Sequence, residues 1–176
     1  MTNLPSSRIL YFMICGAPPA KQALTTVTLL QEAGWDVYVI ATPQGSRWID
    51  QPAIEALTGH TVQTDYRFPG EDSSRPKADA ILVLPATFNT INKWAQGISD
   101  TLVTSILCDT LGRGTPPVLV IPSLKMDLVR HPAFASSVAL LRQYGISILH
   151  EPERYPSALA IPWEQIANAL YKMLPK

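Results

Sequence analysis

The sequence predicts an α/β fold of three layers, in which helices cover both faces of a six-stranded parallel sheet. Short, continuous apolar runs end in Gly or Pro, which is typical of parallel strands buried on both faces. These runs alternate with longer stretches whose apolar residues recur every three to four positions, which indicates amphipathic helices. Many of the 16 prolines stand directly after an apolar run, where proline marks a strand end or a helix start.

The individual elements follow from this pattern in chain order. Strands are expected at residues 9–14, 37–41, 61–63, 80–84, 118–121 and 146–149. Helices are expected at residues 20–33, 52–57, 90–96, 101–111, 132–144 and 163–174. Residues 65–77 are polar and contain Gly, Ser and Pro, which favours a loop. A second loop is expected at residues 150–162.

Length and composition narrow the class of protein. The 176 residues fit one domain, and we expect the whole chain, 1–176, to form it. Apolar residues make up 47% of the chain and charged residues 16%, so a sizeable core is expected and a disordered chain is not. Lys plus Arg and Asp plus Glu number 14 each. This balance gives no electrostatic reason to expect nucleic acid or an anionic membrane as a partner.

The cysteines and histidines give no sign of a disulfide or metal framework. Cys15 and Cys108 are far apart and fit no zinc spacing, and we interpret Cys15 as a buried, inert thiol. His60, His131 and His150 are scattered, so no metal is expected. No leader precedes the first strand and no apolar run approaches roughly 18 residues. These features predict a cytoplasmic protein in a reducing compartment.

Small and uncharged polar residues follow four of the predicted strands. Gly16-Ala17 follows the first strand, Thr42-Pro43 the second, residues 85–90 the fourth and residues 122–125 the fifth. In open α/β sheets, ligands bind beyond this edge, and backbone N–H groups at helix starts favour a phosphate. Each segment alone is an ordinary cap or turn, whereas four of the same character favour a shared ligand.

Two nucleotide-binding motifs are absent from these positions. The first strand is not followed by Gly-x-Gly-x-x-Gly, and no acidic residue ends the second strand. No Gly-Lys-Ser/Thr follows a strand either. The sequence therefore excludes the dinucleotide fingerprint and the P-loop.

Residues 85–102 carry a specific motif, Pro-Ala-Thr-Phe-Asn-Thr-Ile-Asn-Lys-Trp-Ala-Gln-Gly-Ile-Ser-Asp-Thr-Leu. It resembles a signature of a flavoprotein family, the homo-oligomeric flavin-containing cysteine decarboxylases. That signature is Pro-Ala-Ser/Thr-x-Asn-Thr, then Lys, then Gly-Ile/Leu-x-Asp-Asn-Leu. Cys15-Gly16-Ala17 is similar to the family's Thr-Gly-Ser turn. Thr42-Pro43 with Arg47-Trp48 is similar to its second flavin-contacting segment, and His131-Pro132 is similar to the start of a later helix. The resemblance covers roughly residues 8–150.

The resemblance implies a Rossmann-like sheet that holds FMN between subunits, in a trimer or an assembly of trimers. Gly16 and Ala17 would face the phosphate or the ribityl chain, and Thr42 the phosphate side. Trp48 would lie near the ring, with a core or interface tryptophan as an equal alternative. The residues implied to line the flavin are Pro85, Ala86, Thr87, Asn89 and Thr90. The motif residues implied to shape a helix and subunit contacts are Lys93 and Asp100.

Three departures from the family pattern concern the substrate. Glu71 stands where the family's decarboxylases carry a histidine, and a carboxylate does not replace imidazole as a base near neutral pH. Lys125 replaces the Asn of the family's Pro-x-Met-Asn-x-x-Met-Trp clamp, where it either pairs with an anion or lies on the surface. The family's late flap is replaced by residues 155–163. Glu71 and Lys125 remain weak candidates for contact with a substrate.

These features together predict an FMN-binding flavoprotein with a changed substrate apparatus. The first hypothesis is a flavin-dependent oxidoreductase or decarboxylase of a small acid, other than a standard cysteine decarboxylase. The second is a flavin prenyltransferase-like protein, for which Lys125, Arg130 and Arg47 are the candidate basic residues. The third is a non-catalytic, flavin-binding regulatory subunit.

Overall fold

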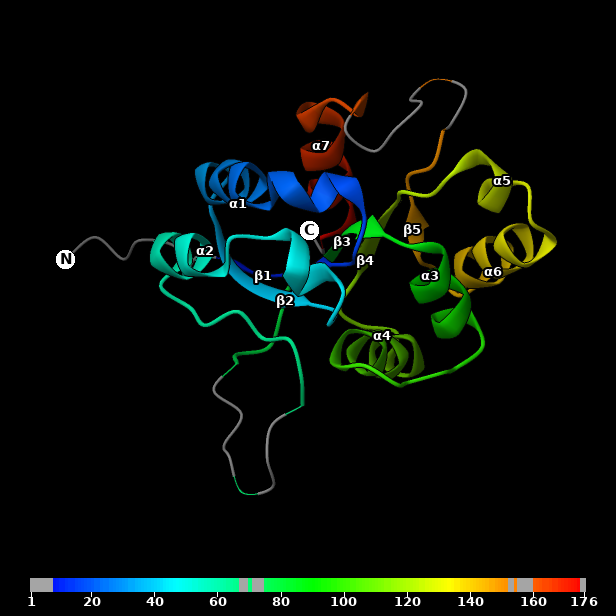
Figure 1. Ribbon diagram of the computed structural model, residues 1–176, viewed down its shortest axis with the longest axis horizontal. Helices are drawn as coiled ribbons and strands as arrows, with labels where there is room; N and C mark the ends of the chain where they lie inside the picture. The colour runs from blue at the N-terminus through cyan, green and yellow to red at the C-terminus, as the bar shows by residue number, and fades with distance from the viewer. Residues whose placement is uncertain (1–7, 67–69, 71–74, 152–153, 155–159, 175–176) are drawn as a thin grey trace.

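The computed structural model describes residues 8–66, 70, 75–151, 154 and 160–174. Their strands pair in parallel in one sheet with the order β2-β1-β3-β4-β5 (Figure 1). The strands are β1 (Arg8–Ile14), β2 (Trp35–Ala41), β3 (Ala80–Ala86), β4 (Val118–Pro122) and β5 (Ser147–Ile148). All seven residues of β3 are buried, as expected for a central strand covered on both faces.

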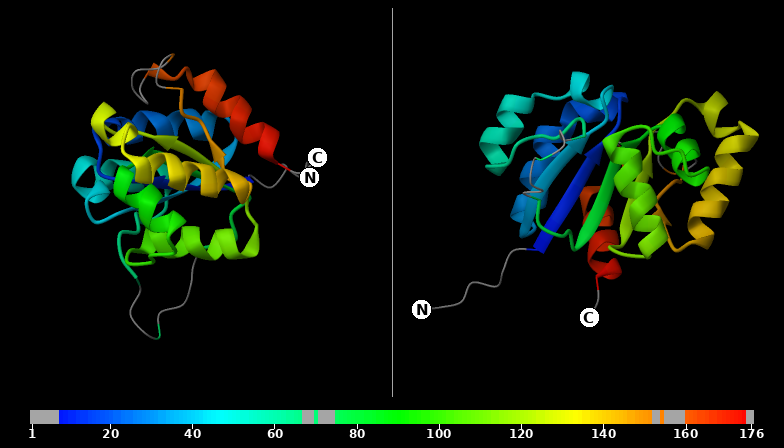
Figure 2. Two further views of the ribbon diagram at one scale, coloured as in Figure 1. Left: turned by 90° about the vertical axis from the view of Figure 1, so that its right-hand side faces the viewer. Right: turned by 90° about the horizontal axis from the view of Figure 1, so that it is seen from below.

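Helices lie on both faces of this sheet (Figure 2). The α-helices are α1 (Ala23–Glu32), α2 (Gln51–Thr58), α3 (Phe88–Ala95), α4 (Leu102–Arg113), α5 (Met126–Val129), α6 (Pro132–Gln143) and α7 (Trp163–Met173). Two 3₁₀ helices, η1 (Pro18–Gln22) and η2 (Gly45–Trp48), follow β1 and β2. The helix expected from residue 20 therefore starts as 3₁₀ helix, with Pro18 and Pro19 in its first turn.

Two apolar clusters hold the three layers together. On one face, Val27 of α1, Ile54 of α2 and Leu170 of α7 are fully buried against the sheet. On the other face, Trp94 of α3 and Leu107 of α4 pack against the sheet, together with residues of α6. The indole Nε1–H of Trp94 donates to the carbonyl of Leu107 at 2.9 Å, so this large side chain is buried without an unpaired polar atom. The predicted three-layer α/β architecture is confirmed.

The prediction of a sixth strand at residues 61–63 was wrong. The segment contributes one isolated parallel bridge between Ile40 and Gln63. Ala41 donates its N–H to the carbonyl of Gln63 at 2.8 Å, and Gln63 donates to the carbonyl of Val39 at 3.1 Å. Val62 is the only buried residue of this short segment. Gln63 is therefore bridged to the edge of β2, but its neighbours do not continue the hydrogen bonding as a strand would.

Two searches of the described residues bear on membranes and metals. None of their helices has the length and the apolar character needed to cross a membrane. Within the same residues, no three His, Cys, Asp or Glu side chains gather as ligands for a metal ion.

Candidate functional site: a cleft at the carboxyl ends of the strands

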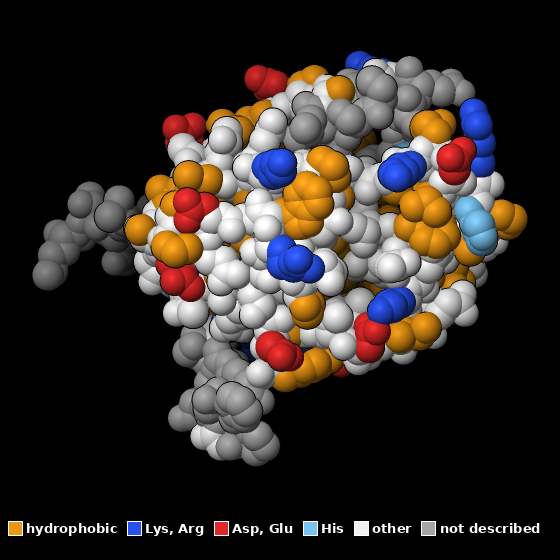
Figure 3. Space-filling model, in the orientation of Figure 1, with side chains coloured by type: hydrophobic (Ala, Val, Ile, Leu, Met, Phe, Trp, Pro, Cys, Tyr) orange, Lys and Arg blue, Asp and Glu red, His pale blue; other side chains and the backbone are white. Residues whose placement is uncertain are grey.

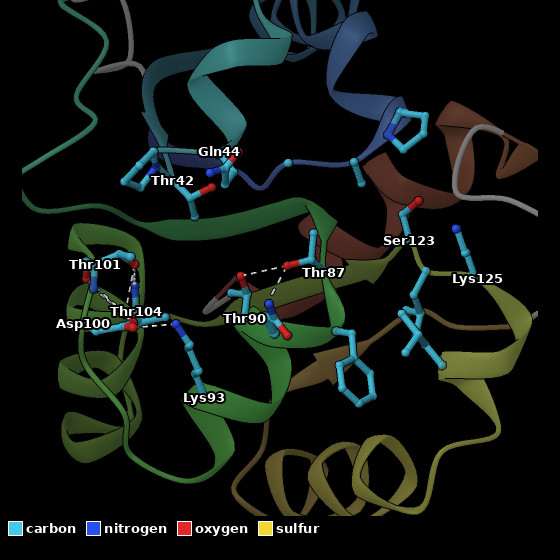
Figure 4. Close-up of a pocket in the computed structure, with 18 residues that line it drawn as sticks. Thr42, Gln44, Thr87, Thr90, Lys93, Asp100, Thr101, Thr104, Ser123 and Lys125 are labelled. Atoms are coloured by element: carbon cyan, nitrogen blue, oxygen red, sulfur yellow. Dashed lines mark hydrogen bonds and ion pairs between the residues drawn. The ribbon is translucent and has the colours of Figure 1, made fainter.

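A cleft of about 870 Å³ lies where the chain leaves β1, β2, β3 and β4 (Figure 4). Figure 3 shows this face of the molecule, with Lys and Arg side chains on several sides of its centre. The lining combines small residues, hydroxyl groups, one ion pair and a few apolar side chains. The lining residues are Gly16, Ala17, Pro18, Thr42, Pro43, Gln44, Thr87, Phe88, Asn89, Thr90, Lys93, Asp100, Thr101, Thr104, Ser123, Leu124, Lys125 and Leu128.

The segments after β1 and β2 pack so closely that two glycines are needed. A Cβ atom on Gly16 would lie 2.9 Å from the Cβ of Gln44, and one on Gly45 would lie 2.2 Å from the carbonyl oxygen of Ile14. Thr42 ties the same turn together, because its Oγ1 accepts the N–H of Gly45 at 2.9 Å. This side of the cleft is therefore fixed by backbone packing.

The first turn of α3 forms the centre of the cleft. Thr87 is its N-cap, and Thr87 Oγ1 accepts the N–H of Thr90 at 3.4 Å. The hydroxyl groups of Thr87 and Thr90 lie 3.1 Å apart. Behind them, the thiol of Cys15 donates to Thr90 Oγ1 at 3.3 Å. Burial raises the pKa of the Cys15 thiol, against the opposing effect of its hydrogen bonds with Thr90 and Thr87, so the thiol stays protonated.

The N-terminus of α4 borders one end of the cleft. Thr101 and Thr104 form a reciprocal capping box, each side chain accepting the other's backbone N–H. Beside them, Lys93 Nζ pairs with Asp100 Oδ2 at 2.5 Å. The hydrogen bond from Lys93 lowers the pKa of Asp100 below its ordinary value. The charges at this end therefore neutralise each other.

The opposite end of the cleft carries the cation of Lys125 (Figure 4). Lys125 precedes α5 and lines the cleft next to Ser123 and Leu124. Within the described part of the chain, Lys125 makes no ion pair. Because Lys93 and Asp100 pair with each other, Lys125 is the unpaired charge among the described residues of the lining.

Most of the residues singled out from the sequence come together in this cleft. Those that line it are Gly16, Ala17, Thr42, Thr87, Asn89, Thr90 and Lys125. Pro85 and Ala86 lie within buried β3 and are not among the lining residues. Trp48 also lies outside the lining; it packs against the core on the face of α1, with Lys21 Nζ 5.5 Å from its ring centroid. Glu71 lies outside the described residues.

Several lining residues were not predicted to contact a ligand. Gln44 stands two residues after Thr42 at the second strand end, and that position could have indicated it. Thr101 and Thr104 cap a helix that does not follow a strand, so no strand-end rule could have found them. Lys93 and Asp100 were assigned to helix shape and subunit contacts, and they also line the cleft.

Comparison with known proteins identifies the family of this scaffold. The profile of the family described as Flavoprotein matches residues 2–174. The chain belongs to the Flavoprotein family. Among curated relatives, the coenzyme A biosynthesis bifunctional protein CoaBC of Bacillus subtilis is 31% identical over 157 residues, which is 85% of this chain and 37% of the relative. The CoaBC of Mycobacterium tuberculosis H37Rv is 33% identical over 141 residues, 77% of this chain and 32% of the relative. The chain therefore spans about a third of the length of these relatives.

Several solved structures share the fold of this Flavoprotein family member. The FMN-dependent cysteine decarboxylase SpaF superimposes with a TM-score of 0.77 at 26% identity, over 96% of this chain and 97% of SpaF. The epidermin biosynthesis protein EpiD from Staphylococcus aureus gives a TM-score of 0.66 at 26% identity, over 81% and 82% of the two chains. A PPC decarboxylase mutant at 20% identity, with a TM-score of 0.70 over 81% of each chain, shows the fold alone. The resemblance found in the sequence is confirmed at the level of the family.

Proposed function

We propose that the cleft binds FMN, with the phosphate near the exits of β1 and β2 and the isoalloxazine ring beside α3. The observation that carries this proposal is the convergence of four strand ends into one cleft lined by small and uncharged polar residues. Gly16 and Ala17 are small residues of the lining, and Thr87, Asn89 and Thr90 add hydroxyl and amide groups. Such groups suit a phosphate and the carbonyl and nitrogen atoms of a flavin.

The size and the apolar part of the lining fit the same ligand. The volume of about 870 Å³ lies within the usual range for sites that hold a cofactor. Phe88, Leu124 and Leu128 offer apolar surface to an aromatic ring. Membership of the Flavoprotein family, and the FMN named for the neighbour SpaF, support FMN as the group that this chain holds.

The proposed activity is that of a flavin-dependent decarboxylase or oxidoreductase acting on a small acid. A bound flavin supplies the capacity to accept two electrons from a substrate. Lys125, with Ser123 beside it, would hold the negative group of that substrate, since it is the unpaired cation of the described lining. Glu71 and Lys125 stand in place of the family's histidine and asparagine, so we propose a substrate other than that of a standard cysteine decarboxylase.

Titration with FMN tests the cofactor. The purified chain is expected to bind FMN at one site per chain, with quenching of flavin fluorescence, and to bind riboflavin more weakly because riboflavin lacks the phosphate. Asn89→Ala removes one amide from the cleft and is expected to weaken FMN binding about fivefold, the effect of one hydrogen bond. Asn168→Ala, at an exposed position of α7 outside the lining, is the matched control and should not change the affinity.

Turnover assays test the reaction class. The FMN-loaded chain would be incubated with small carboxylic acids and with a peptide that ends in cysteine, while flavin reduction and CO₂ release are followed. Turnover of small acids alone supports the proposal, and rapid decarboxylation of the cysteine peptide contradicts the changed substrate. Binding of FMN without turnover of any of them favours the non-catalytic subunit, and a flavin spectrum altered by dimethylallyl phosphate favours the prenyltransferase-like role.

We also propose that the chain assembles with copies of itself, as a trimer or an assembly of trimers. The support is the resemblance of residues 85–102 to the motif of homo-oligomeric flavoproteins. Light scattering after size-exclusion chromatography measures the mass directly. A mass of three chains, or a multiple of three, is the expected result, and a monomer would contradict it.

A further inference from the structure

A chain of three hydrogen-bonding side chains leads from the buried end of β1 to the cleft. It is made of Cys15, Thr90 and Thr87. Cys15 is only 1% exposed and Thr90 6%, whereas Thr87 is partly exposed where it lines the cleft. The backbone of Cys15 is held in turn, since its N–H donates to the carbonyl of Pro85 at 3.1 Å. The three side chains are therefore fixed relative to one another.

Either hydroxyl can donate between Thr90 and Thr87, and hydrogen-bond accounting allows the chain to run from Cys15 through Thr90 to Thr87. A hydroxyl group has one proton to donate and two lone pairs to accept with. Because the protonated thiol of Cys15 donates to Thr90 Oγ1 at 3.3 Å, the proton of the Thr90 hydroxyl is free to reach Thr87 Oγ1 at 3.1 Å. Thr87 Oγ1 also accepts the N–H of Thr90 at 3.4 Å. Both of its lone pairs are then used, and the capacity left to Thr87 is that of a donor.

The surroundings of Thr87 favour donation into the cleft. The sulfur of Cys15 is near enough to interact with Thr87, but a thiol sulfur is a weak acceptor compared with oxygen or nitrogen. A ligand acceptor atom in the cleft would therefore compete well for the proton of Thr87. Without a donor at Cys15, the Thr90 hydroxyl could rotate, and the direction of the chain would be lost.

We propose that Cys15 is a positioning residue that directs the Thr90 and Thr87 hydroxyls so that Thr87 donates its O–H to an acceptor atom of the bound isoalloxazine ring. This inference rests on the proposed binding of FMN. It gives the buried thiol a role without making it reactive, since burial keeps the thiol protonated.

A double-mutant cycle on FMN affinity tests the inference. Cys15→Ala removes the donor and is expected to weaken FMN binding about fivefold, as expected for one misdirected hydrogen bond. Thr87→Val removes the final donor and is expected to have a similar effect. If Cys15 acts through Thr87, adding Cys15→Ala to Thr87→Val has no further effect on affinity. Thr90→Val removes the middle hydroxyl of the chain. Adding Cys15→Ala to Thr90→Val should likewise cause no further loss of FMN affinity.

Conservative variants and the flavin spectrum separate this role from simple packing. Cys15→Ser and Thr90→Ser keep a donor and should retain FMN affinity within about twofold. They should also retain the visible absorption maxima of bound FMN, whereas Cys15→Ala and Thr87→Val should shift those maxima alike. Cys108→Ala changes the other thiol, which is half-buried on α4 outside the lining, and should leave both measurements unchanged.

The outcomes distinguish this inference from the proposed function. A wild-type chain that binds no FMN overturns both. A wild-type chain that binds FMN, with additive losses in both cycles or with a spectrum that Cys15→Ala leaves unchanged, overturns the role of Cys15 alone. If Thr87→Val does not fold, the cycle with Thr90→Val decides by the same criterion.

Discussion

The two sides of the cleft are built differently. On the side of β1 and β2, Gly16 and Gly45 have no room for a Cβ atom, and Thr42 is only 8% exposed. On the side of β4, helix α5 has no buried residue, and Met126 is 49% exposed and Leu128 36% exposed. One side is fixed by backbone packing, and the other is a short surface segment between β4 and α6.

This difference separates residues whose positions are fixed by packing from exposed residues that can be substituted without disturbing the fold. A group bound against Gly16, Thr42 and Thr87 contacts atoms that cannot move without disturbing the sheet. The exposed residues of this segment, Lys125, Met126 and Leu128 among them, can change with little effect on stability. Under the proposed function, the cofactor would lie on the fixed side, and Lys125, which would meet the substrate, lies on the side that can change.

The largest expected effect is on the fixed side, at Gly45. In Gly45→Ala, the new methyl group would lie 2.2 Å from the carbonyl oxygen of Ile14. Because that neighbour is backbone, β1 or η2 must shift, at a cost of about 3 kcal/mol in the free energy of unfolding. FMN affinity should fall as well, since Gly45 N–H holds Thr42 Oγ1. Urea denaturation and FMN titration measure the two effects.

Gly112→Ala is the matched control for this substitution. Gly112 lies in α4, and a Cβ atom there meets nothing within 4 Å. Alanine is the better helix former, so this variant should gain about 0.5–1 kcal/mol. If Gly45→Ala proves as stable as Gly112→Ala, the close packing of the fixed side is wrong.

A smaller effect is expected on the other side, at Lys125. Lys125→Met should change the free energy of unfolding by less than about 0.5 kcal/mol, because it removes no ion pair within the described residues. A short peptide with a free carboxylate, followed through the spectrum of bound FMN, should bind the wild type about tenfold more tightly than its amide does. Lys125→Met should abolish that preference.

Lys93→Met is the control for this test, because it removes the other lysine of the lining. Lys93 lines the same cleft but pairs with Asp100, so it is not available to a ligand. The preference for the carboxylate peptide should survive Lys93→Met. Loss of the preference in Lys93→Met, with its retention in Lys125→Met, would reverse the assignment of the two cations.

The sheet could be predicted largely from local signals. Runs such as residues 80–84 are continuously apolar and end in proline, and only a strand covered on both faces suits that pattern. The strand predicted at residues 61–63 is a single bridge. A three-residue pattern is the same for one bridged residue and for a short run of paired residues, so the pattern could not distinguish them. Residues 146–149 shortened to Ser147–Ile148 at the sheet edge, where boundaries depend on tertiary pairing.

The site could be predicted only where it follows a strand. Gly16, Thr42 and Thr87 stand at strand ends, which parallel pairing brings to one edge. Thr104 lies in the first turn of α4, and the turn between α3 and α4 places it at the cleft. The direction of that turn could not be predicted from a local sequence pattern. The bond between Cys15 and Thr90 joins residues 75 positions apart. It depends on the pairing of β1 with β3, which exists only in the folded chain.

The smallest expected effect concerns pH at the paired end of the cleft. The hydrogen bond from Lys93 lowers the pKa of Asp100 in the folded chain, so the unfolded chain binds a proton at higher pH than the folded chain does. Asp100 therefore stabilises the fold above its unfolded pKa of about 3.9, and that contribution is lost as the pH falls through the lower, folded value. Asp100→Asn should be less stable than the wild type in urea at pH 7, and the difference should begin to shrink as the pH falls below about 4 and vanish below the lower, folded pKa. In the Lys93→Met background the same substitution should have a smaller pH-dependent effect, because the largest cause of the lowered pKa is gone while the hydrogen bond from Thr104 remains. A pH dependence of the same size there would show that Lys93 is not its main cause.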